Sequence, residues 1–289
     1  MDAAPAVDSL NARNTMTDRY ALLGNPVGHS KSPLIHAGFA EATGHDIVYG
    51  LIEAPLDGFA AAALAFRDSG AKGCNITTPF KLEAFALATD RLERAEQAGA
   101  VNCIKFERDG RILAENFDGI GLAKDIERNL GFAMAGQRVL LLGAGGATRG
   151  TLGPFLASRP AELVIANRTE AKAVALARQY AAQGRTIGCG YTDLKGERFD
   201  LVVNATSASL RGELPPIDTG VFTNAALAYE LAYGKGLTPF LRLAQNAGVP
   251  RLADGVGMLV EQAAEAWVWW RGVRPDTRAV IDRLTVPLT

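Results

Sequence analysis

From Arg19 onward, short runs of apolar and β-branched residues alternate with stretches whose apolar positions recur every three or four residues. In the first half this pattern predicts strands over 20–23, 47–52, 74–77 and 100–106, and helices over 33–42, 56–68, 79–88 and 92–98. Strands that alternate with helices are typical of a largely parallel sheet covered by helices on both faces. We therefore expect the first half to form one α/β unit.

A second series of strands follows, over 139–142, 163–166, 201–204 and 226–231, again with helices between them. A helix over 118–130 joins the two series. The last long helical stretch, 257–270, is amphipathic, and we expect it to pack back on the first unit. The predicted fold class is therefore α/β, with two α/β domains in series.

Length and composition agree with this architecture, because 289 residues suffice for two domains of roughly 150 residues each. Thirty basic and 31 acidic side chains give a formal net charge of -1. Nucleic-acid and membrane-surface binding usually need a concentrated basic patch, so we expect neither kind of partner. No apolar run approaches the ~20 residues of a membrane span.

Three cysteines (Cys74, Cys103 and Cys189) are an odd number without metal-ligand spacing, so we expect buried free thiols and no metal site. Free thiols favour a reducing, cytoplasmic location. The first 18 residues lack the basic start and the apolar stretch of a signal peptide. We expect residues 1–18 to form a flexible tail.

The second unit carries a glycine-rich turn directly after its first strand, GAGGATRG at 143–150. Glycines at such a turn let the backbone approach a pyrophosphate, whose charge the following helix N-terminus stabilises. The strict dinucleotide spacing requires Gly or Ala at position 148, where this chain has Thr148. The motif alone therefore leaves open a tight turn of any doubly wound fold.

The end of the next strand favours a phosphorylated dinucleotide. An NAD-binding unit places an acidic residue there, whereas this chain has Asn167, Arg168 and Thr169, with Lys172 one helical turn later. A guanidinium can bind a 2′-phosphate through two hydrogen bonds, whereas an acidic group would repel it. A solvated helix start is the alternative, but two cations in a first turn oppose the helix dipole. We therefore predict NADP(H) as the cofactor.

Candidate chemistry in the first unit lies in CNITTPFK at 74–81. If Thr78 caps a helix and Pro79 lies in its first turn, Lys81 follows beyond the carboxyl end of a strand, where α/β sites form. Asp118 is either an ordinary helix cap or the partner of Lys81. The polar loop GNPVGHSKSP at 24–33 suits a carboxylate, with Ser32 as cap, as ligand or as both.

Nine short segments occur in order along the chain: GNPVGHSKSP (24–33), NITTPFK (75–81), AGAVN (98–102), NFDG (116–119), GAGGATRG (143–150), NRT (167–169), NATS (204–207), YGKGLTPF (233–240) and DGVGMLVEQA (254–263). Together they resemble the shikimate dehydrogenase family over about residues 19–289. The resemblance implies NADPH-dependent, reversible reduction of 3-dehydroshikimate to shikimate, in chorismate and aromatic amino-acid biosynthesis, by a monomer or homodimer. It also implies a substrate domain of 19–117 plus 255–289, with a Rossmann-like NADP-binding domain, 118–254, inserted.

The same resemblance implies roles for individual residues. Lys81 and Asp118 would be the catalytic pair, with Asp118 orienting Lys81. The substrate would be held by Ser30, Ser32, Asn75, Thr77, Asn102, Tyr233 and Gln262. The cofactor would contact Gly143, Ala144, Gly145, Gly146, Ala147 and Thr148 at its pyrophosphate, Asn167, Arg168, Thr169 and Lys172 at its adenosine phosphate, and Leu231 and Gly255 near its nicotinamide.

The sequence departs from the family pattern at Phe117, Glu230, Thr78 and in SASL at 207–210. Two other functions therefore stay open: a quinate/shikimate dehydrogenase that is more tolerant of quinate and NAD, and a nucleotide-sensing module without catalysis. Among the remaining candidates, we expect His29 to shape its loop, and His36 and His45 to lie on a helix surface and in a loop. Trp267, Trp269 and Trp270 are expected to anchor a core or an interface.

Overall fold

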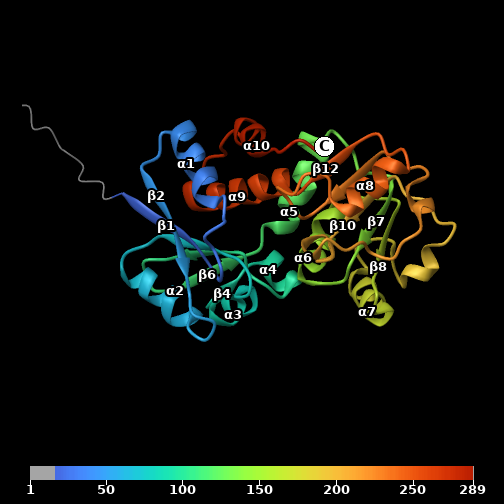
Figure 1. Cartoon of the computed structure of the whole chain (residues 1–289). Coiled ribbons are helices and arrows are strands. Elements are labelled where there is room, and N and C mark those ends of the chain that lie inside the picture. The colour runs from blue at the N-terminus through green and yellow to red at the C-terminus, as the bar shows by residue number, and fades with distance from the viewer. Residues whose placement is uncertain (1–16, 289) are drawn as a thin grey trace, which may run out of the picture.

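The computed structural model describes residues 17–288 as two α/β lobes side by side (Figure 1). The first lobe contains a six-stranded sheet of order β2-β1-β3-β5-β6-β4. Its strands are β1 (Asp18–Gly24), β2 (Ile47–Glu53), β3 (Gly73–Ile76), β4 (Asp90–Arg91), β5 (Cys103–Phe106) and β6 (Ile112–Glu115). β1 pairs in parallel with β2 and β3, and β4 with β6, whereas β5 is antiparallel to both of its neighbours.

The second lobe contains a six-stranded sheet of order β12-β11-β10-β7-β8-β9, in which every pairing is parallel. Its strands are β7 (Arg138–Leu142), β8 (Glu162–Ala166), β9 (Thr186–Cys189), β10 (Leu201–Asn204), β11 (Leu227–Glu230) and β12 (Leu252–Asp254). This is the strand order of doubly wound dinucleotide-binding folds. The order reverses between β7 and β10, and ligands of such folds bind in the crevice at that point.

The helices connect and cover these sheets. They are α1 (Ser32–Thr43), α2 (Phe59–Asp68), α3 (Lys81–Leu87), α4 (Glu93–Ala98), α5 (Asp118–Lys124), α6 (Gly146–Ala157), α7 (Glu170–Tyr180), α8 (Pro239–Asn246), α9 (Val256–Arg271) and α10 (Arg278–Leu284). α5 continues as a π-helical turn, η1 (Asp125–Asn129). The two-domain α/β fold class is thus confirmed.

Several elements differ from the predicted ones. The first sheet is less parallel than expected, because β5 and β6 form a hairpin that the prediction missed. Its signal was the Asp109-Gly110 pair, where Gly110 adopts a φ of 90° that favours glycine. The predictions also missed β4, β9, β12 and α10, and the strand predicted over 100–106 begins only at Cys103. Asp18, which was assigned to the tail, is the first residue of β1, while residues 1–16 of that predicted tail lie outside the described residues.

The prediction that the last long helix returns to the first lobe is confirmed. α9 lies between the lobes in Figure 1 and shares a core with α1, in which Phe39 and Trp267 are fully buried. Trp269 packs against Phe117 and Trp270 stacks on Tyr20, so all three tryptophans are anchors as expected. Among residues 17–288, no helix is long and apolar enough to cross a membrane.

The prediction that His36 lies on a helix surface is wrong. α1 turns the face that carries Ile35, His36 and Phe39 toward α9, and the His36 side chain is fully buried. Its ring stacks on that of Tyr49, with centroids 4.0 Å apart and an 8° angle between the planes. Burial lowers the pKa of His36 to about 3, an effect that nearby Asn75 opposes. His36 is therefore a neutral core residue.

Candidate active site

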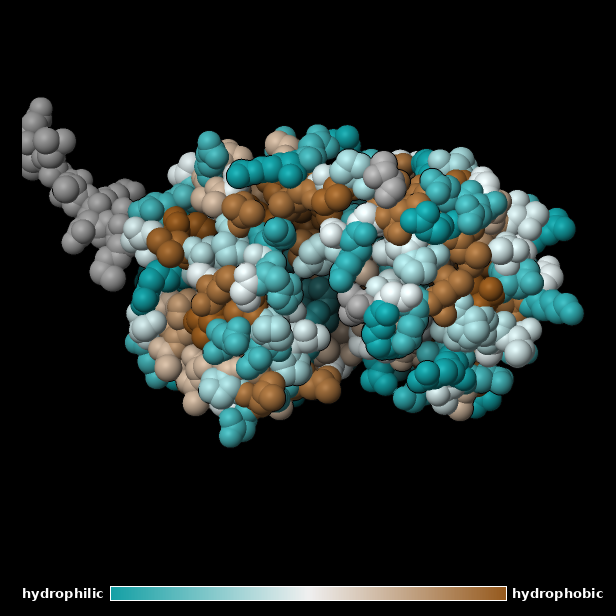
Figure 2. Space-filling view, in the orientation of Figure 1, coloured by the Kyte–Doolittle hydropathy of each residue, from teal (hydrophilic) through white to brown (hydrophobic). Residues whose placement is uncertain are grey.

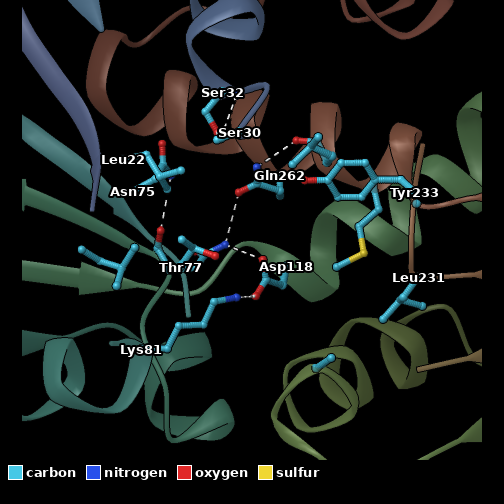
Figure 3. Close-up of a pocket in the computed structure, with 16 residues that line it drawn as sticks. Leu22, Ser30, Ser32, Asn75, Thr77, Lys81, Asp118, Leu231, Tyr233 and Gln262 are labelled. Carbon is cyan, nitrogen blue, oxygen red and sulfur yellow. Dashed lines mark hydrogen bonds and ion pairs between the residues drawn. The ribbon is translucent and has the colours of Figure 1, made fainter. Parts of the chain in front are cut away.

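A cavity of about 230 Å³ lies where the two lobes meet. It is lined by Leu22, Ser30, Ser32, Asn75, Ile76, Thr77, Lys81, Asn102, Asp118, Ala147, Leu231, Tyr233, Gly255, Met258, Leu259 and Gln262. The close-up in Figure 3 shows these side chains converging from the first sheet, from α9 and from the second lobe. Figure 2 shows the molecule hollowed between its lobes, with hydrophilic residues in the depth. All nine residues expected at the catalytic pair and the substrate therefore border one space.

Lys81 and Asp118 face each other in this cavity, with Lys81 Nζ 2.5 Å from Asp118 Oδ2 (Figure 3). The Asn102 side chain donates to the other carboxylate oxygen over 2.7 Å, and Asn116 Oδ1 accepts from the Asp118 backbone N–H at 3.1 Å. The Lys81 and Asp118 side chains are 31% and 15% exposed, so the pair is partly buried and accessible from the cavity. The structure thus brings together two residues that are 37 positions apart.

The helix caps that we predicted around this pair are wrong. α3 begins at Lys81 itself, with Phe80 as its N-cap, because residues 77–80 form a separate turn in which Phe80 N–H donates to Thr77 O. Likewise, Asp118 is the first residue of α5 and the cap position belongs to Phe117. The Asp118 carboxylate is therefore available for Lys81 and Asn102.

Two serines from the loop before α1 lie on another wall of the cavity. Ser30 Oγ accepts a hydrogen bond from the Ser32 backbone N–H and donates one to Ser32 Oγ, both over 3.1 Å. The prediction of Ser32 as an N-cap is wrong, because α1 begins at Ser32 and the cap position is Lys31. The Ser32 hydroxyl therefore makes no capping bond and remains available to a ligand.

A second cavity, of about 390 Å³, lies at the glycine-rich turn where the strand order of the second sheet reverses. Gly143 has a φ of 106°, a conformation that favours glycine. A Cβ atom at Gly145 or Gly146 would meet nothing within 4 Å, so the backbone there is open to close approach by a ligand. The turn precedes the N-terminus of α6, where backbone N–H groups favour an anion.

Thr148, the residue that breaks the strict glycine spacing, is fully buried, and its hydroxyl donates to Gly143 O over 2.9 Å. It therefore fixes the turn from inside, whereas Ala144, Gly145, Gly146 and Ala147 border the cavity. Ala147 also lines the smaller cavity beside Lys81, so the two spaces meet at this turn.

The residues predicted to bind the adenosine phosphate do not all border the same cavity. Asn167 and Arg168 line the 390 Å³ cavity, and Thr169 is the N-cap of α7. Arg168 precedes that cap, so only Lys172 lies in the first helical turn, and the expectation of two cations there is wrong. Lys172 borders a different cavity, of about 760 Å³, together with Lys81 and Arg149.

Arg211, which was not predicted from the sequence, lines the same cavity as Arg168. Its guanidinium donates to the Glu213 carboxylate over 2.8 Å and to Ser207 Oγ over 3.1 Å. Arg168 and Arg211 together lower the pKa of Glu213, with the Arg211 hydrogen bond as the main cause. A signal was present, since Arg211 follows the carboxyl end of β10, at the edge where ligands of this fold bind.

Leu231 and Gly255, predicted near the nicotinamide, both line the 230 Å³ cavity. A Cβ atom at Gly255 would lie 2.1 Å from Leu231 O, so only glycine fits where β12 meets α9. Leu231, which follows β11, and Gly255, the N-cap of α9, thus border the same cavity as the Lys81–Asp118 pair.

Comparison with known proteins places these features in one family. The model of the shikimate dehydrogenase substrate binding domain matches residues 22–104, that of shikimate/quinate 5-dehydrogenase residues 122–211, and that of the shikimate 5'-dehydrogenase C-terminal domain residues 255–285. A relative from Nitrosospira multiformis, shikimate dehydrogenase (NADP(+)), is 57% identical over 93% of this chain and 98% of its own. The chain belongs to the shikimate dehydrogenase family.

Further relatives agree with this assignment. A shikimate dehydrogenase (NADP(+)) from Chromobacterium violaceum is 53% identical over 93% of this chain and 98% of its own. The crystal structure of an Ael1 enzyme from Pseudomonas putida is 63% identical, with a TM-score of 0.91 over 94% of this chain and 100% of that one. Shikimate 5-dehydrogenase from Thermus thermophilus, solved with NADP(H) and shikimate, is 30% identical, with a TM-score of 0.81 over 92% and 97%.

The departures from the pattern of the shikimate dehydrogenase family now have structural contexts. The backbone N–H of Phe117 donates to Asn102 Oδ1 over 2.9 Å, and its ring is buried against Trp269. Glu230 is buried and accepts hydrogen bonds from Asn204, over 2.9 Å, and from Ser209. Burial raises the pKa of Glu230. Its hydrogen bonds connect β11 with Asn204 at the end of β10 and with Ser209 in the loop that follows.

Thr78 lines the 760 Å³ cavity, together with Lys81 and Asp118, rather than the 230 Å³ cavity that holds the serine pair. The segment 207–210 contains the start of the 3₁₀ turn η3 (Ser209–Arg211), which carries Arg211 toward the cavity of Arg168. Neither departure replaces a residue of the Lys81–Asp118 pair.

Proposed function

We propose that this protein is an NADP-dependent shikimate dehydrogenase that reversibly reduces 3-dehydroshikimate to shikimate. The observation that carries the proposal is the Lys81–Asp118 pair, which faces a cavity bordered both by the serine pair and by the glycine-rich turn. Relatives at 53% and 57% identity that bear this enzyme name support it. The reaction belongs to the shikimate pathway, which leads to chorismate and the aromatic amino acids.

Lys81 is proposed to act at the carbonyl oxygen of the substrate. When a hydride reaches the carbonyl carbon, negative charge grows on that oxygen, and a proton must reach it to complete the alcohol. The Lys81 ammonium supplies this proton or stabilises the charge, and in the reverse direction the neutral Lys81 amine takes up the proton of the hydroxyl. Asp118, held by Asn102, keeps Nζ pointed at the reacting position.

The other polar residues of the cavity are proposed to hold the substrate. Ser30 and Ser32 present hydroxyls for its carboxylate, near the N-terminus of α1. Asn75, Thr77, Asn102, Tyr233 and Gln262 surround the space between the serines and Lys81 and suit ring hydroxyls. A site built from such groups discriminates strongly against analogues that leave them unpaired.

The residues at the second cavity fit NADP(H), because the open glycine backbone and the helix N-terminus suit a pyrophosphate. When bound, the nicotinamide supplies or accepts the hydride. Ala144 to Ala147 would border the pyrophosphate, and Leu231 and Gly255 the nicotinamide. Asn167 and Arg168 of this cavity would border the adenosine phosphate, with Thr169 at the N-cap of α7 and Lys172 from the neighbouring 760 Å³ cavity. Gly143 and Thr148 would act by shaping the turn.

We also propose that residues 19–117 with 255–289 form the substrate domain and that 118–254 form the inserted NADP-binding domain. The membership of the strands in the two sheets supports this division, as does the core shared by α1 and α9. A cytoplasmic location, and a monomer or homodimer without a nucleic-acid partner, remain our proposals from the sequence.

One spectrophotometric assay tests the proposed function. Purified protein is given shikimate or quinate, each with NADP⁺ or NAD⁺, and reduced nicotinamide is followed at its absorbance band. We expect turnover to be fastest with shikimate and NADP⁺. Comparable turnover of quinate or use of NAD⁺ would instead indicate the broader quinate/shikimate enzyme, and no turnover in any arm would indicate a binding module.

Cofactor preference is expected to depend on Arg168. Charged hydrogen bonds contribute more than neutral ones, so Arg168→Gln should raise the Kd of NADP⁺ by roughly 10- to 100-fold and change that of NAD⁺ little. Arg211→Gln should have a smaller effect, because Arg211 is already paired with Glu213. Isothermal titration calorimetry measures both constants. Arg185→Gln is the control, since Arg185 is an exposed arginine of the same lobe that pairs with Glu162. Equal losses for both nucleotides would contradict a 2′-phosphate contact.

A further inference from the structure

Tyr49 lies beneath the proposed substrate site without lining its cavity. It comes from β2, and its hydroxyl donates to Asn75 Oδ1 over 2.7 Å. The Tyr49 ring also stacks on the His36 ring, with the two ring centroids 4.0 Å apart. Because His36 is fully buried in the core, the stack fixes the direction of the Tyr49 hydroxyl.

The amide of Asn75 has a defined polarity in this arrangement. Its Nδ2 donates to the backbone oxygen of Asn102 over 3.3 Å, and that oxygen can only accept. A flipped amide would place two oxygens against each other, so Nδ2 must face Asn102 and Oδ1 must face Tyr49. Burial also raises the pKa of Tyr49 well above its usual range, which keeps its hydroxyl protonated and able to donate.

One hydrogen of the Asn75 amide is left over. Tyr49 donates to Oδ1 and Asn102 accepts one of the two Nδ2 hydrogens, while Asn75 lines the cavity and is 5% exposed. The donor that Asn75 can offer to a substrate is therefore the second N–H, which needs an oxygen acceptor.

We propose that Tyr49 is a positioning residue, which locks the Asn75 amide so that it presents an N–H donor to an oxygen of the substrate. This inference rests on the proposed function for the identity of the substrate. Tyr49 itself touches no reacting atom; it acts through Asn75. The sequence alone does not indicate this role, because it depends on the hydrogen bond between Tyr49 on β2 and Asn75 on β3. These two strands are separated in the sheet by β1.

Removal of the hydroxyl alone tests the proposal. In Tyr49→Phe, Asn75 Oδ1 loses its donor and the amide is held only by its bond to Asn102 O, so its orientation becomes less well defined and the KM for shikimate should rise roughly 5- to 10-fold. The kcat should stay within about twofold and the Kd of NADP⁺ should not change, because Lys81 and the glycine-rich turn are not touched. Tyr20→Phe is the matched control: Tyr20 is the register partner of Tyr49 on β1, and its hydroxyl contacts only Arg271 among the described residues.

A double-mutant cycle separates positioning from a general packing effect. In an Asn75→Ala background, the Tyr49→Phe change should add no further increase in KM. The same increase in both backgrounds, or an unchanged KM in Tyr49→Phe, would overturn the proposal. Asn75→Asp keeps the shape but removes the donor, so a KM equal to that of the unmodified protein would overturn the assigned polarity.

A readout without substrate distinguishes this inference from the proposed function. The side-chain amide signal of Asn75 in a ¹H–¹⁵N spectrum is identified by its loss in Asn75→Ala. Its hydrogens should exchange with water faster in Tyr49→Phe than in the unmodified protein or in Tyr20→Phe. Unchanged exchange would refute the positioning role even in a protein that oxidises shikimate. Faster exchange in a protein without shikimate turnover would uphold it while the proposed function fails.

Discussion

Replacement of Lys81 by alanine should lower the kcat for shikimate oxidation by about 10²- to 10⁴-fold, the usual contribution of a positioned general acid or base. The physical reason is that Asp118 holds Lys81 Nζ in the 230 Å³ cavity, and Lys81 is the one cationic side chain among the described residues that line it. The Kd of NADP⁺ should change little, because Lys81 does not line the cavity that contains Arg168. Steady-state kinetics and calorimetric titration measure the two quantities separately.

Lys105→Ala is the matched control for this experiment. Lys105 lies on β5 of the same lobe, is 33% exposed against 31% for Lys81, and also forms an ion pair, with Glu107 at 3.1 Å. Its removal should leave kcat unchanged, because it borders neither of the cavities that contain Lys81. If Lys81→Ala retained normal turnover, its assigned role would be wrong. If both lysine variants lost turnover together, a general loss of folding would be the cause.

Much of the fold was predictable from local pattern. β7, β8 and β10 are continuous apolar runs buried on both faces, and the helices between them have clear helical spacing, so short-range sequence determines them. β9 and β12 were not predictable in this way. β9 contains Gly188 and leaves Ile187 exposed, and β12 has only three residues. Such strands exist because a neighbouring strand offers backbone partners, which the local sequence does not reveal.

The site was predictable as a set of residue types but not as a geometry. Lys81 was found because it follows a predicted strand, and Asp118 because it stands at the start of a predicted helix; both lie in segments that resemble a family. Their contact depends on the pairing of β3 with β5 and of β5 with β6, which brings the segment after β3 close to the start of α5. It also depends on the Asn102 side chain, which donates a hydrogen bond to Asp118. His36 was misplaced because histidine as a residue type is seldom fully buried, although its neighbours Ile35 and Phe39 are apolar, and because α9, which covers it through Trp267, lies more than 200 residues later in the sequence. The position of Arg211 depends on the turn η3, because Ser209 of that turn donates a hydrogen bond to Glu230 on β11.

Replacement of Gly119 by alanine should have the largest effect on stability, because α5 and α6 approach each other there through their backbones. A Cβ atom at Gly119 would lie 1.9 Å from Gly150 O and 2.8 Å from Thr151 Cα. These are backbone atoms of a helix, which no rotamer change can move away. Overpacking of this kind typically costs 1–3 kcal/mol and occasionally more, so we expect a loss of about 3 kcal/mol in the free energy of unfolding. In a protein of this size the melting temperature should then fall by roughly 6–12 °C.

Gly150→Ala is the matched control, since it adds the same methyl group to the other helix of the same contact. There a Cβ atom would lie 3.4 Å from Asn116 Oδ1 and 3.8 Å from Ala98 Cβ, which is ordinary contact. Because alanine is more favourable than glycine in a helix interior, the stability of Gly150→Ala should be unchanged or slightly raised.

Gly119→Ala should in addition lower turnover. α5 begins at Asp118 and α6 begins at the glycine-rich turn, so separation of the two helices would displace the catalytic carboxylate from the cofactor site. Thermal unfolding and kcat of both variants test these predictions. An unchanged melting temperature in Gly119→Ala would show that α5 and α6 can move apart without loss of stability. Their close approach would then not stabilise the arrangement of the two lobes.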